Sequence, residues 1–349
     1  MGFIPKPGKP DYSDPRSHRP ITLSSFLLKT LERLILWHLD DTSLRDYPLH
    51  ASQYGFRHNR GTDNAVSRLV STVEADQCLK KRTMGVFLDI KGAFDNTDYT
   101  SIRSALLRHK IPPEISDWCM NLLQTRTTSA QNASSGHKIT IQHTRGVPQG
   151  GILSPTLWNL AFDPLLDVLT SCTDHTIAYA DDVCFLLSYE DARDAESRAN
   201  EALQRAYEWS IANGLEFCPH KSEFMIFEKK PSDPPVALLL GNAILDRQES
   251  ITYLGVHLTP NLRWMDHIKL KITQAKRALS ISNNAFGKIW GPVPKMMHWT
   301  FKAIATPKAL YAAHVWHKDT YNKQVQTKLL SLTRSSPTAV SKPRRPFSK

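Results

Sequence analysis

The sequence has few cysteines and no uninterrupted apolar run, and both absences narrow the class of protein. Its 349 residues contain five cysteines, at positions 78, 119, 172, 184 and 218, and none of them forms a CxxC pair. This spacing excludes a disulfide-stapled secreted domain and a zinc knuckle, so we expect free thiols. The longest apolar stretch, residues 21–39, is interrupted by Lys29, Glu32 and Arg33, which excludes a transmembrane helix.

The N-terminal sequence MGFIPKPGKPDYSD also lacks the apolar core of a signal peptide. With neither a secretion signal nor a membrane span, we expect an intracellular protein with no membrane partner. Hydrophobic residues make up 41% of the chain and charged residues 22%, which is ordinary globular usage and excludes wholesale disorder. A mass of 39.5 kDa suits two domains or one composite fold with lobes.

Positive charge is concentrated at one end of the chain. The formal net charge is +11, but residues 260–349 hold 17 Lys or Arg against Asp266 and Asp319, a balance of +15 that leaves −4 for the remainder. Tryptophans at 264, 290, 299 and 316 are interleaved with these cations. A basic helix face is most often merely solvated, yet an asymmetry this large favours contact with a nucleic-acid backbone.

Apolar periodicity predicts an α+β fold, because helices and strands do not alternate strictly along the chain. The region beyond 263 has a helical and basic pattern to about 332. Ser154 is expected to cap a helix that has Pro155 at its first position. The other expected elements are helices over 23–39, 62–79, 100–108, 114–123 and 190–213, strands over 84–90, 224–227 and 251–258, a hairpin within 129–146, and two strands within 177–187 joined at an acidic dipeptide.

Three aspartates lie in or beside apolar strands. Asp89 follows VFL (86–88), and Asp181 and Asp182 lie between IAYA (177–180) and VCFLL (183–187). Taken singly, each aspartate is explained by a turn or a helix cap, but an ionised carboxylate in such surroundings is costly without a cation. Together they form a hard oxygen cluster suited to Mg²⁺, as used in nucleotidyl transfer and in nuclease chemistry. Composition and spacing do not choose between these two reactions.

Ordered local motifs resemble those of reverse transcriptases. The segments FLDIKGAFD (87–95), GVPQGGILSP (146–155) and YADD (179–182) are similar to motifs A, B and C, in that order. The resemblance extends over roughly residues 3–320 and is to the non-LTR, LINE-type retrotransposon enzymes. It includes the fingers segments KPGKP (6–10), HRPI (18–21) and QYGFR (53–57), motif D within 214–223, the primer-grip motif YLGV (253–256), and a thumb-side pattern of Trp264, His267, Tyr311 and Trp316.

The resemblance implies a right-hand polymerase fold with an antiparallel palm sheet and a helical thumb. The implied domains are fingers at 1–83 and 110–145, palm at 84–109 and 146–258, a thumb-like basic helical region at 259–332, and a frayed tail at 333–349. The implied activity is that of an RNA-directed DNA polymerase, which adds dNTPs to a primer 3′-OH. The expected partners are an RNA template, a DNA primer and dNTPs. We expect the endonuclease and other domains of a parent polyprotein to be missing from this chain, and integration to require nuclear access.

The resemblance also assigns roles to single residues. It implies two Mg²⁺ ions, with Mn²⁺ as an alternative, held by Asp89, Asp181 and Asp182, and Lys221 as the general acid for the leaving pyrophosphate. Phe94 would exclude a ribose 2′-OH by steric clash. Arg19 would contact the triphosphate, with Lys6 or Lys9 as second candidates. Ile90, Gln149 and Gly150 would contact the nucleotide. Leu254 and Gly255 would contact the primer.

Other polar residues are expected to have structural roles, and two other functions stay open. Asp95 is expected to cap the helix after motif A, and His267 to be a hydrogen-bonded structural histidine. One alternative is a catalytically silent, truncated or domesticated relative that only binds nucleic acid; the intact aspartates argue against it. The other is a phosphodiester-cleaving enzyme, which the lack of a water-activating His or Glu near the acidic turn disfavours.

Overall fold

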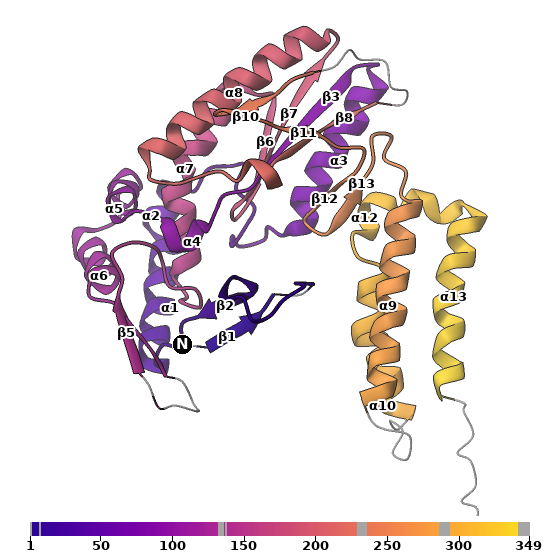
Figure 1. The fold of residues 1–349 in the computed structure, drawn as a ribbon, viewed down its shortest axis with the longest axis horizontal. Helices are drawn as coiled ribbons and strands as arrows, with labels where there is room; N and C mark the ends of the chain where they lie inside the picture. The colour runs from indigo at the N-terminus through magenta and orange to yellow at the C-terminus, as the bar shows by residue number, and fades with distance from the viewer. Residues whose placement is uncertain are drawn as a thin grey trace, which may run out of the picture. The chain divides into compact units, whose positions relative to one another are not determined.

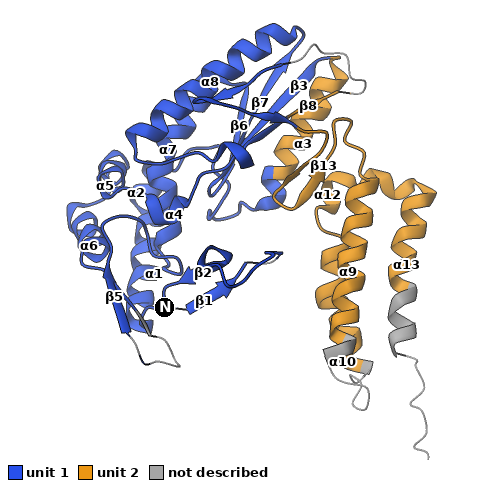
Figure 2. Cartoon of the chain, viewed as in Figure 1, with its two compact units in different colours: residues 1–65, 81–224, 232–247 blue, residues 66–80, 225–231, 248–349 orange. Residues whose placement is uncertain are grey.

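The chain divides into two compact units (Figure 2). The computed structural model describes residues 2–6, 8–131, 136, 138–228, 236–285 and 294–340. The first unit comprises residues 1–65, 81–224 and 232–247, and the second comprises 66–80, 225–231 and 248–349. Most of the predicted fingers and palm lies in the first unit, but residues 66–80 of the predicted fingers and residues 225–231 and 248–258 of the predicted palm fall in the second. The division into fingers, palm and thumb stays a prediction.

A five-stranded sheet carries the predicted carboxylates (Figure 1). Its strand order is β11-β8-β3-β7-β6, and β3, β7 and β6 are antiparallel neighbours. Strand β3 is buried on both faces from Thr83 to Leu88, which explains why its sequence is a continuous apolar run without alternation. The strands are β3 (Arg82–Leu88), β6 (His175–Tyr179), β7 (Asp182–Tyr189), β8 (Glu223–Phe227) and β11 (Asp246–Arg247).

Two long helices, α7 (Ser154–Cys172) and α8 (Ala192–Ala212), pack against each other and against the sheet strands β6 and β7. Helix α7 is apolar over most of its circumference, as expected for a helix enclosed by other elements. The predicted cap at Ser154 was wrong, because Ser154 is the first helical residue and Leu153 takes the cap position. The loop before α7 is instead held by a carboxylate from another helix, since Glu32 accepts the Ile152 N–H.

A helical core in the first unit joins α7 to three shorter helices. Leu39, Ile102, Leu106, Leu123 and Leu157 form its centre, and each is at most 3% exposed. Burial of a leucine side chain stabilises a fold by about 2 kcal/mol, so this cluster holds the helices together. The helices are α1 (Phe26–Asp41), α2 (Ser43–Asp46), α4 (Ala93–Asn96), α5 (Tyr99–Arg108) and α6 (Pro113–Gln124), and α3 (Thr62–Cys78) begins in this unit.

Two longer antiparallel hairpins and one short one complete the described part of the first unit. The N-terminal hairpin was expected only as an extended segment, and the second one confirms the hairpin predicted within 129–146. Their strands, with the short strands and turns of this unit, are β1 (Gly2–Pro5), β2 (His18–Ile21), β4 (Thr127–Gln131), β5 (Lys138–Gln142), β9 (Leu239–Leu240), β10 (Ala243–Ile244), η1 (Pro15–Ser17) and η2 (Pro219–Lys221).

Besides most of α3 and the end of β8, the second unit contains a hairpin followed by helices. A single strand was expected over 251–258, but the structure forms a hairpin with Leu254 and Gly255 at its turn, both with positive φ. Helix α13 continues through 333–340, so the expected frayed tail is helical at its start, and residues 341–349 lie outside the described part. The elements are β12 (Ile251–Tyr253), β13 (Val256–Leu258), α9 (Met265–Ala285), α10 (Pro294–Thr300), η3 (Phe301–Ala305), α11 (Thr306–Ala309), α12 (Ala313–Trp316), η4 (His317–Tyr321) and α13 (Lys323–Val340).

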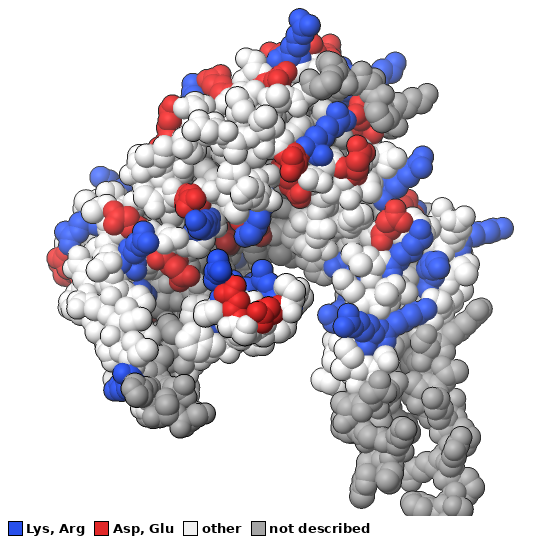
Figure 3. Space-filling view, viewed as in Figure 1, with Lys and Arg blue, Asp and Glu red and all other residues white. Residues whose placement is uncertain are grey.

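The mixed helix and strand content confirms the predicted α+β class. On the face drawn in Figure 3, Lys and Arg side chains predominate over Asp and Glu on the second unit, while both signs are interspersed over the first. In the described parts of the chain, no helix combines the length and the apolar character that a membrane crossing requires.

Candidate active site

The three predicted aspartates come together at one end of the β3–β7–β6 strands. In the antiparallel register Leu88 pairs with Val183, so one further step places Asp89 opposite Asp182. Tyr179 pairs with Asp182 across the neighbouring hairpin, which leaves Ala180 and Asp181 as a two-residue turn. The strand pairing therefore brings together residues that are more than ninety positions apart in the sequence.

Negative charge is poorly compensated in this cluster. Desolvation raises the pKa of Asp181, with a further contribution from the charge of Asp89. The pKa of Asp182 is raised to about 6, first by desolvation and then by the charges of Asp181 and Asp89. Asp182 keeps an exposed side, so water reaches its carboxylate although the chain displaces part of its hydration. A site with these properties favours a bound cation.

One lysine reaches the cluster from a distant segment. The Nζ of Lys221 lies 2.9 Å from Oδ2 of Asp89, and this hydrogen bond is the main reason why the pKa of Lys221 is raised. Backbone pairing just beyond β3 brings the segment that carries Lys221 close to Asp89, because the N–H of Cys218 donates to the Asp89 carbonyl at 2.8 Å. The N–H of Asp89 in turn donates to the Ser222 hydroxyl at 3.1 Å. Motif A and motif D are thus joined by main-chain pairing.

The turn carrying Asp181 is braced by a segment whose role was not predicted. The N–H of Tyr54 donates to the Ala178 carbonyl at 2.7 Å. The fully buried Gln53 side chain accepts the N–H of Ala180 at 3.0 Å and of Gly55 at 2.9 Å. A Cβ on Gly55 would lie 2.3 Å from the Ala180 nitrogen, so only glycine permits this approach. The three residues that brace the turn are the first three of the QYGFR motif (53–57), so the sequence did contain a signal for this role.

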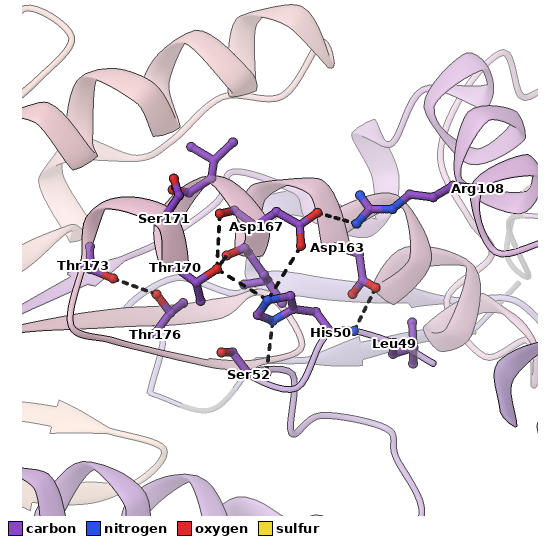
Figure 4. Close-up of polar contacts among 12 residues, drawn as sticks. Leu49, His50, Ser52, Arg108, Asp163, Asp167, Thr170, Ser171, Thr173 and Thr176 are labelled. Atoms are coloured by element: carbon purple, nitrogen blue, oxygen red, sulfur yellow. Dashed lines mark hydrogen bonds and ion pairs between the residues drawn. The ribbon is translucent and has the colours of Figure 1, made fainter. Parts of the chain in front are cut away.

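Helix α7 anchors the start of this bracing segment (Figure 4). Asp163, only 1% exposed, accepts the backbone N–H of His50 at 2.9 Å. The imidazole Nδ1 of His50 accepts the Ser52 N–H at 3.1 Å, so its Nε2 carries the proton and lies 3.7 Å from Asp167. Asp167 also pairs with Arg108 from α5. Polar contacts, of which the one at Asp163 is buried, thus link the core helices to the segment that braces the turn carrying Asp181.

Phe94 belongs to a row of aromatic rings. Its ring stacks on Trp158, with centroids 6.0 Å apart and planes at 26°, and lies edge-on to Phe56 at 6.4 Å. Trp158 stacks in turn on Phe162 at 5.1 Å. Because Trp158 and Phe162 are fully buried on α7, the orientation of the half-buried Phe94 ring is defined by packing.

The Gln149 loop, defined as residues 146–152, is held from three directions. The Val147 N–H donates to the Phe94 carbonyl at 2.7 Å, and the Thr22 N–H donates to the Gln149 carbonyl at 2.7 Å. The Gln149 side-chain amide donates to both oxygens of Asp95 at 3.1 and 3.2 Å. Asp95 therefore orients Gln149, and the prediction that it caps a helix was wrong: it lies inside α4, and Asp98 is the residue before α5.

The remaining residues predicted to bind the nucleotide differ in whether their side chains act on the carboxylates. The exposed Arg19 on β2 is near enough for its charge to lower the pKa of Asp181 against the larger effect of burial. Lys6 donates to the Arg16 carbonyl at 3.0 Å, and the charge of Lys9 acts on Asp14, so both belong to the N-terminal hairpin. Ile90 is 4% exposed and pairs with Phe217, which turns its side chain into the core.

The predicted primer-grip residues lie in the second unit on the β12–β13 turn. The Tyr311 hydroxyl donates to the Leu254 carbonyl at 2.7 Å, and Lys271 lies over the Tyr311 ring at 4.4 Å. The Tyr311 carbonyl accepts from His267 Nε2 at 3.2 Å and from Trp316 Nε1 at 3.0 Å. The thumb-side pattern is therefore a hydrogen-bonded network, in which His267 has the predicted structural role.

The carboxylate oxygens fit a divalent metal by their chemistry, although they are not arranged as a finished site. Among the described residues, no group of three or more His, Cys, Asp or Glu side chains is positioned to hold a metal ion. The ion pair with Lys221 engages Asp89, whereas burial, followed by the charges of neighbouring carboxylates, raises the pKa values of Asp181 and Asp182. The arrangement thus places one ammonium group beside carboxylates that are partly removed from water.

Comparison with known families gives an extensive match. A family model described as reverse transcriptase (RNA-dependent DNA polymerase) matches residues 4–258. Over 282 residues the chain is 31% identical to the probable RNA-directed DNA polymerase from transposon BS of Drosophila melanogaster, covering 76% of this chain and 30% of that protein. It is also 24% identical over 326 residues to the putative 115 kDa protein of the retrotransposable element R1DM from the same species, covering 93% and 31%. The chain thus spans less than a third of these relatives.

Solved structures show the same fold. Apo telomerase from Candida tropicalis matches with a TM-score of 0.50 and 11% identity, covering 90% of this chain and 59% of that chain. A form of that telomerase truncated from its C-terminal domain also gives 0.50, at 14% identity, covering 68% and 45%. At these identities the likeness shows the fold alone, and it confirms the predicted right-hand polymerase architecture.

Proposed function

Because this chain belongs to the reverse transcriptase family, as the non-LTR retrotransposon polymerases do, we propose that it is the RNA-directed DNA polymerase core of such an element. The observation that carries the proposal is the meeting of Asp89, Asp181 and Asp182 at adjoining strand ends. The reaction is attack of a primer 3′-OH on the α-phosphate of a dNTP, with pyrophosphate as the leaving group. An RNA strand serves as the template.

Asp89, Asp181 and Asp182 would hold two Mg²⁺ ions, for which Mn²⁺ could substitute. When bound, such ions stabilise the charge on the entering and leaving oxygens of an in-line phosphoryl displacement. The supporting observation is that burial, and after it the charges of the neighbouring carboxylates, raise the pKa values of Asp181 and Asp182. Asp89 would contribute a carboxylate to these ions, and Lys221, which pairs with Asp89 in this structure, would lie beside the substrate.

The chain's own residues bind the nucleotide and move the proton. Lys221 donates a proton to the leaving pyrophosphate as general acid. Arg19 holds the triphosphate through its guanidinium group, with Lys6 and Lys9 as weaker candidates because their contacts lie within the N-terminal hairpin. The Phe94 ring blocks a ribose 2′-OH, since its stacking on Trp158 keeps it from moving aside.

The remaining contacts position template and primer. The Gln149 loop lies against the nucleotide through Gln149 and Gly150, and Ile90 contributes through its backbone alone because its side chain is buried. Leu254 and Gly255 hold the primer through the backbone of their turn. The basic helices of the second unit bind phosphates of the template and primer, in keeping with the charge of +15 over 260–349. Integration would require access to the nucleus and activities from further domains.

Primer extension on an RNA template tests the proposal. The wild-type chain should incorporate dNTPs onto a DNA primer in the presence of Mg²⁺, whereas Asp181→Asn should extend at background level, because the amide keeps the shape but not the charge of the ligand. Equal extension by both proteins would refute the polymerase proposal. Tight binding to the primed template without extension by the wild-type chain would identify the silent, nucleic-acid-binding alternative.

A further inference from the structure

A buried carboxylate on helix α1 has no place in the proposed reaction. Glu32 is 2% exposed, and in the described part of the chain no lysine or arginine pairs with it. Its neighbours Leu31 and Arg33 are exposed, so the side chain of Glu32 alone turns inward at this point of the helix. Burying an ionised carboxylate is costly unless strong hydrogen bonds compensate, which points to a specific task for this residue.

The partner of Glu32 is the Gln149 loop. Oε2 of Glu32 accepts the Ile152 N–H at 2.9 Å, two residues before helix α7 begins. The carboxylate therefore faces the N-terminus of a long helix, where unpaired N–H groups and the helix dipole favour negative charge. This compensates the desolvation of Glu32 and ties the C-terminal end of the loop to α1.

Close packing accompanies this hydrogen bond. A Cβ on Gly151 would lie 3.3 Å from Oε1 of Glu32 and 2.5 Å from Oγ of Ser154. A side chain at position 151 would therefore press on the Glu32 carboxylate and would require the Ser154 hydroxyl to shift. At its other end the loop is held by Phe94, and in the middle by Thr22. Without Glu32, the segment after Gln149 would lose its only carboxylate contact among the described residues.

We propose that Glu32 is a positioning residue for nucleotide binding, which acts by fixing the Gln149 loop from the side of α1. The proposal rests on the proposed function, because it assumes that Gln149 contacts the incoming nucleotide. Loss of the carboxylate leaves the Ile152 N–H unpaired and gives the loop additional conformations. Nucleotide binding must then select one of them, which weakens the apparent affinity in proportion to the population that is competent to bind.

Steady-state extension with Glu32→Met and Glu32→Gln tests this role. Glu32→Met should raise the KM for dNTP about tenfold while kcat and primer–template affinity change less than about twofold, since the carboxylates and Lys221 are untouched. Glu32→Gln keeps an oxygen that can accept the Ile152 N–H, and its KM should stay within about threefold of the wild-type value. An unchanged KM in Glu32→Met would overturn the proposal.

Two further variants separate positioning from loss of stability. Leu39→Ala removes a fully buried side chain from the same helix, so it should lower the melting temperature and leave the KM for dNTP unchanged. In a Gln149→Ala background, Glu32→Met should add little to the KM, because both changes affect one contact. Fully additive effects of Glu32→Met and Gln149→Ala would contradict a role through Gln149.

Amide hydrogen exchange gives a readout that does not need activity. Exchange of the Ile152 amide should accelerate at least tenfold in Glu32→Met and remain slow in Glu32→Gln. If the wild-type chain extends no primer, the proposed function fails, while this measurement still decides whether Glu32 holds the loop. If Glu32→Met does not fold, Gly151→Ala disturbs the same contact from the loop, and unchanged exchange and KM in that variant would overturn the inference.

Discussion

At the scale of single residues, Lys221 gives the sharpest test of the chemistry. Lys221→Met should lower kcat about a hundredfold or more, since general acid catalysis typically contributes that much, and should affect primer–template affinity little. Lys91→Met is a matched control, because Lys91 is equally exposed and forms a similar 3.0 Å ion pair, with Glu216. Surface pairs of that kind contribute about 0–1 kcal/mol, so the control should remain active. Equal loss of kcat in both variants would exclude a specific role for Lys221.

A second prediction at the scale of single residues concerns Phe94. Phe94→Ala should increase incorporation of ribonucleotides relative to deoxyribonucleotides, because the clash with the 2′-OH disappears. Phe94→Tyr keeps the ring and its stacking on Trp158 and should retain the discrimination. The ratio of kcat/KM for rNTP and dNTP measures both. A ratio that is the same in Phe94→Ala as in the wild type would refute the role of Phe94 in excluding ribonucleotides.

At the scale of elements, the bracing of the Asp181 turn predicts a difference between two glycines. Gly55→Ala should destabilise the fold by about 1–3 kcal/mol and reduce extension, since the new Cβ would meet the Ala180 backbone. Gly61→Ala should be nearly neutral, because the nearest atom lies 3.9 Å from the added Cβ. Chemical unfolding measures both changes. A Gly55→Ala variant as stable as Gly61→Ala would show that the turn adapts.

The network around Tyr311 predicts a dependence of stability on pH. Burial lowers the pKa of His267 to about 4, and its Nδ1 accepts the His257 N–H, so the folded state holds the ring neutral. In the unfolded chain this histidine binds a proton below about 6.5. Stability should therefore fall as the pH drops from about 6.5 to 4, by about 1.4 kcal/mol per unit and about 3 kcal/mol in all. Denaturant titrations of the wild type and His267→Gln should differ by this slope; identical slopes would contradict it.

Several elements were predictable from the local sequence pattern. The predictions that were wrong failed for physical reasons. The strands near Asp89 and Asp181 were foreseen because their apolar runs are short and bounded. The cap predicted at Ser154 was wrong, because the helix begins one residue earlier than the pattern indicates, so that Ser154 is already helical and Leu153 takes the cap position. Asp95 binds Gln149 across 54 positions, and no periodicity reports such a contact.

At the scale of the whole molecule, the charge asymmetry predicts salt-dependent binding of nucleic acid. Affinity for a primed RNA should fall steeply as KCl rises, because phosphate contacts release counterions. The double variant Lys302→Ala/Lys308→Ala, at exposed positions of the second unit, should reduce the slope of log K against log salt by about one or more. The double variant Lys138→Ala/Arg193→Ala, at exposed positions of the first unit, should leave the slope unchanged. Equal slopes in all three proteins would contradict a basic binding surface on the second unit.

The sequence by itself determined the family, the α+β class, the identity of the three aspartates and the basic end of the chain, because short motifs and charge counts are local properties. Tertiary structure alone decided that Asp89 faces Asp182, that Lys221 reaches Asp89, and that Gln53 and Glu32 support the site. These contacts join segments up to 132 positions apart, and they depend on strand register and on the satisfaction of buried polar groups. Both are properties of the assembled fold, since hydrogen bonds of this kind exist only once the distant segments have packed together.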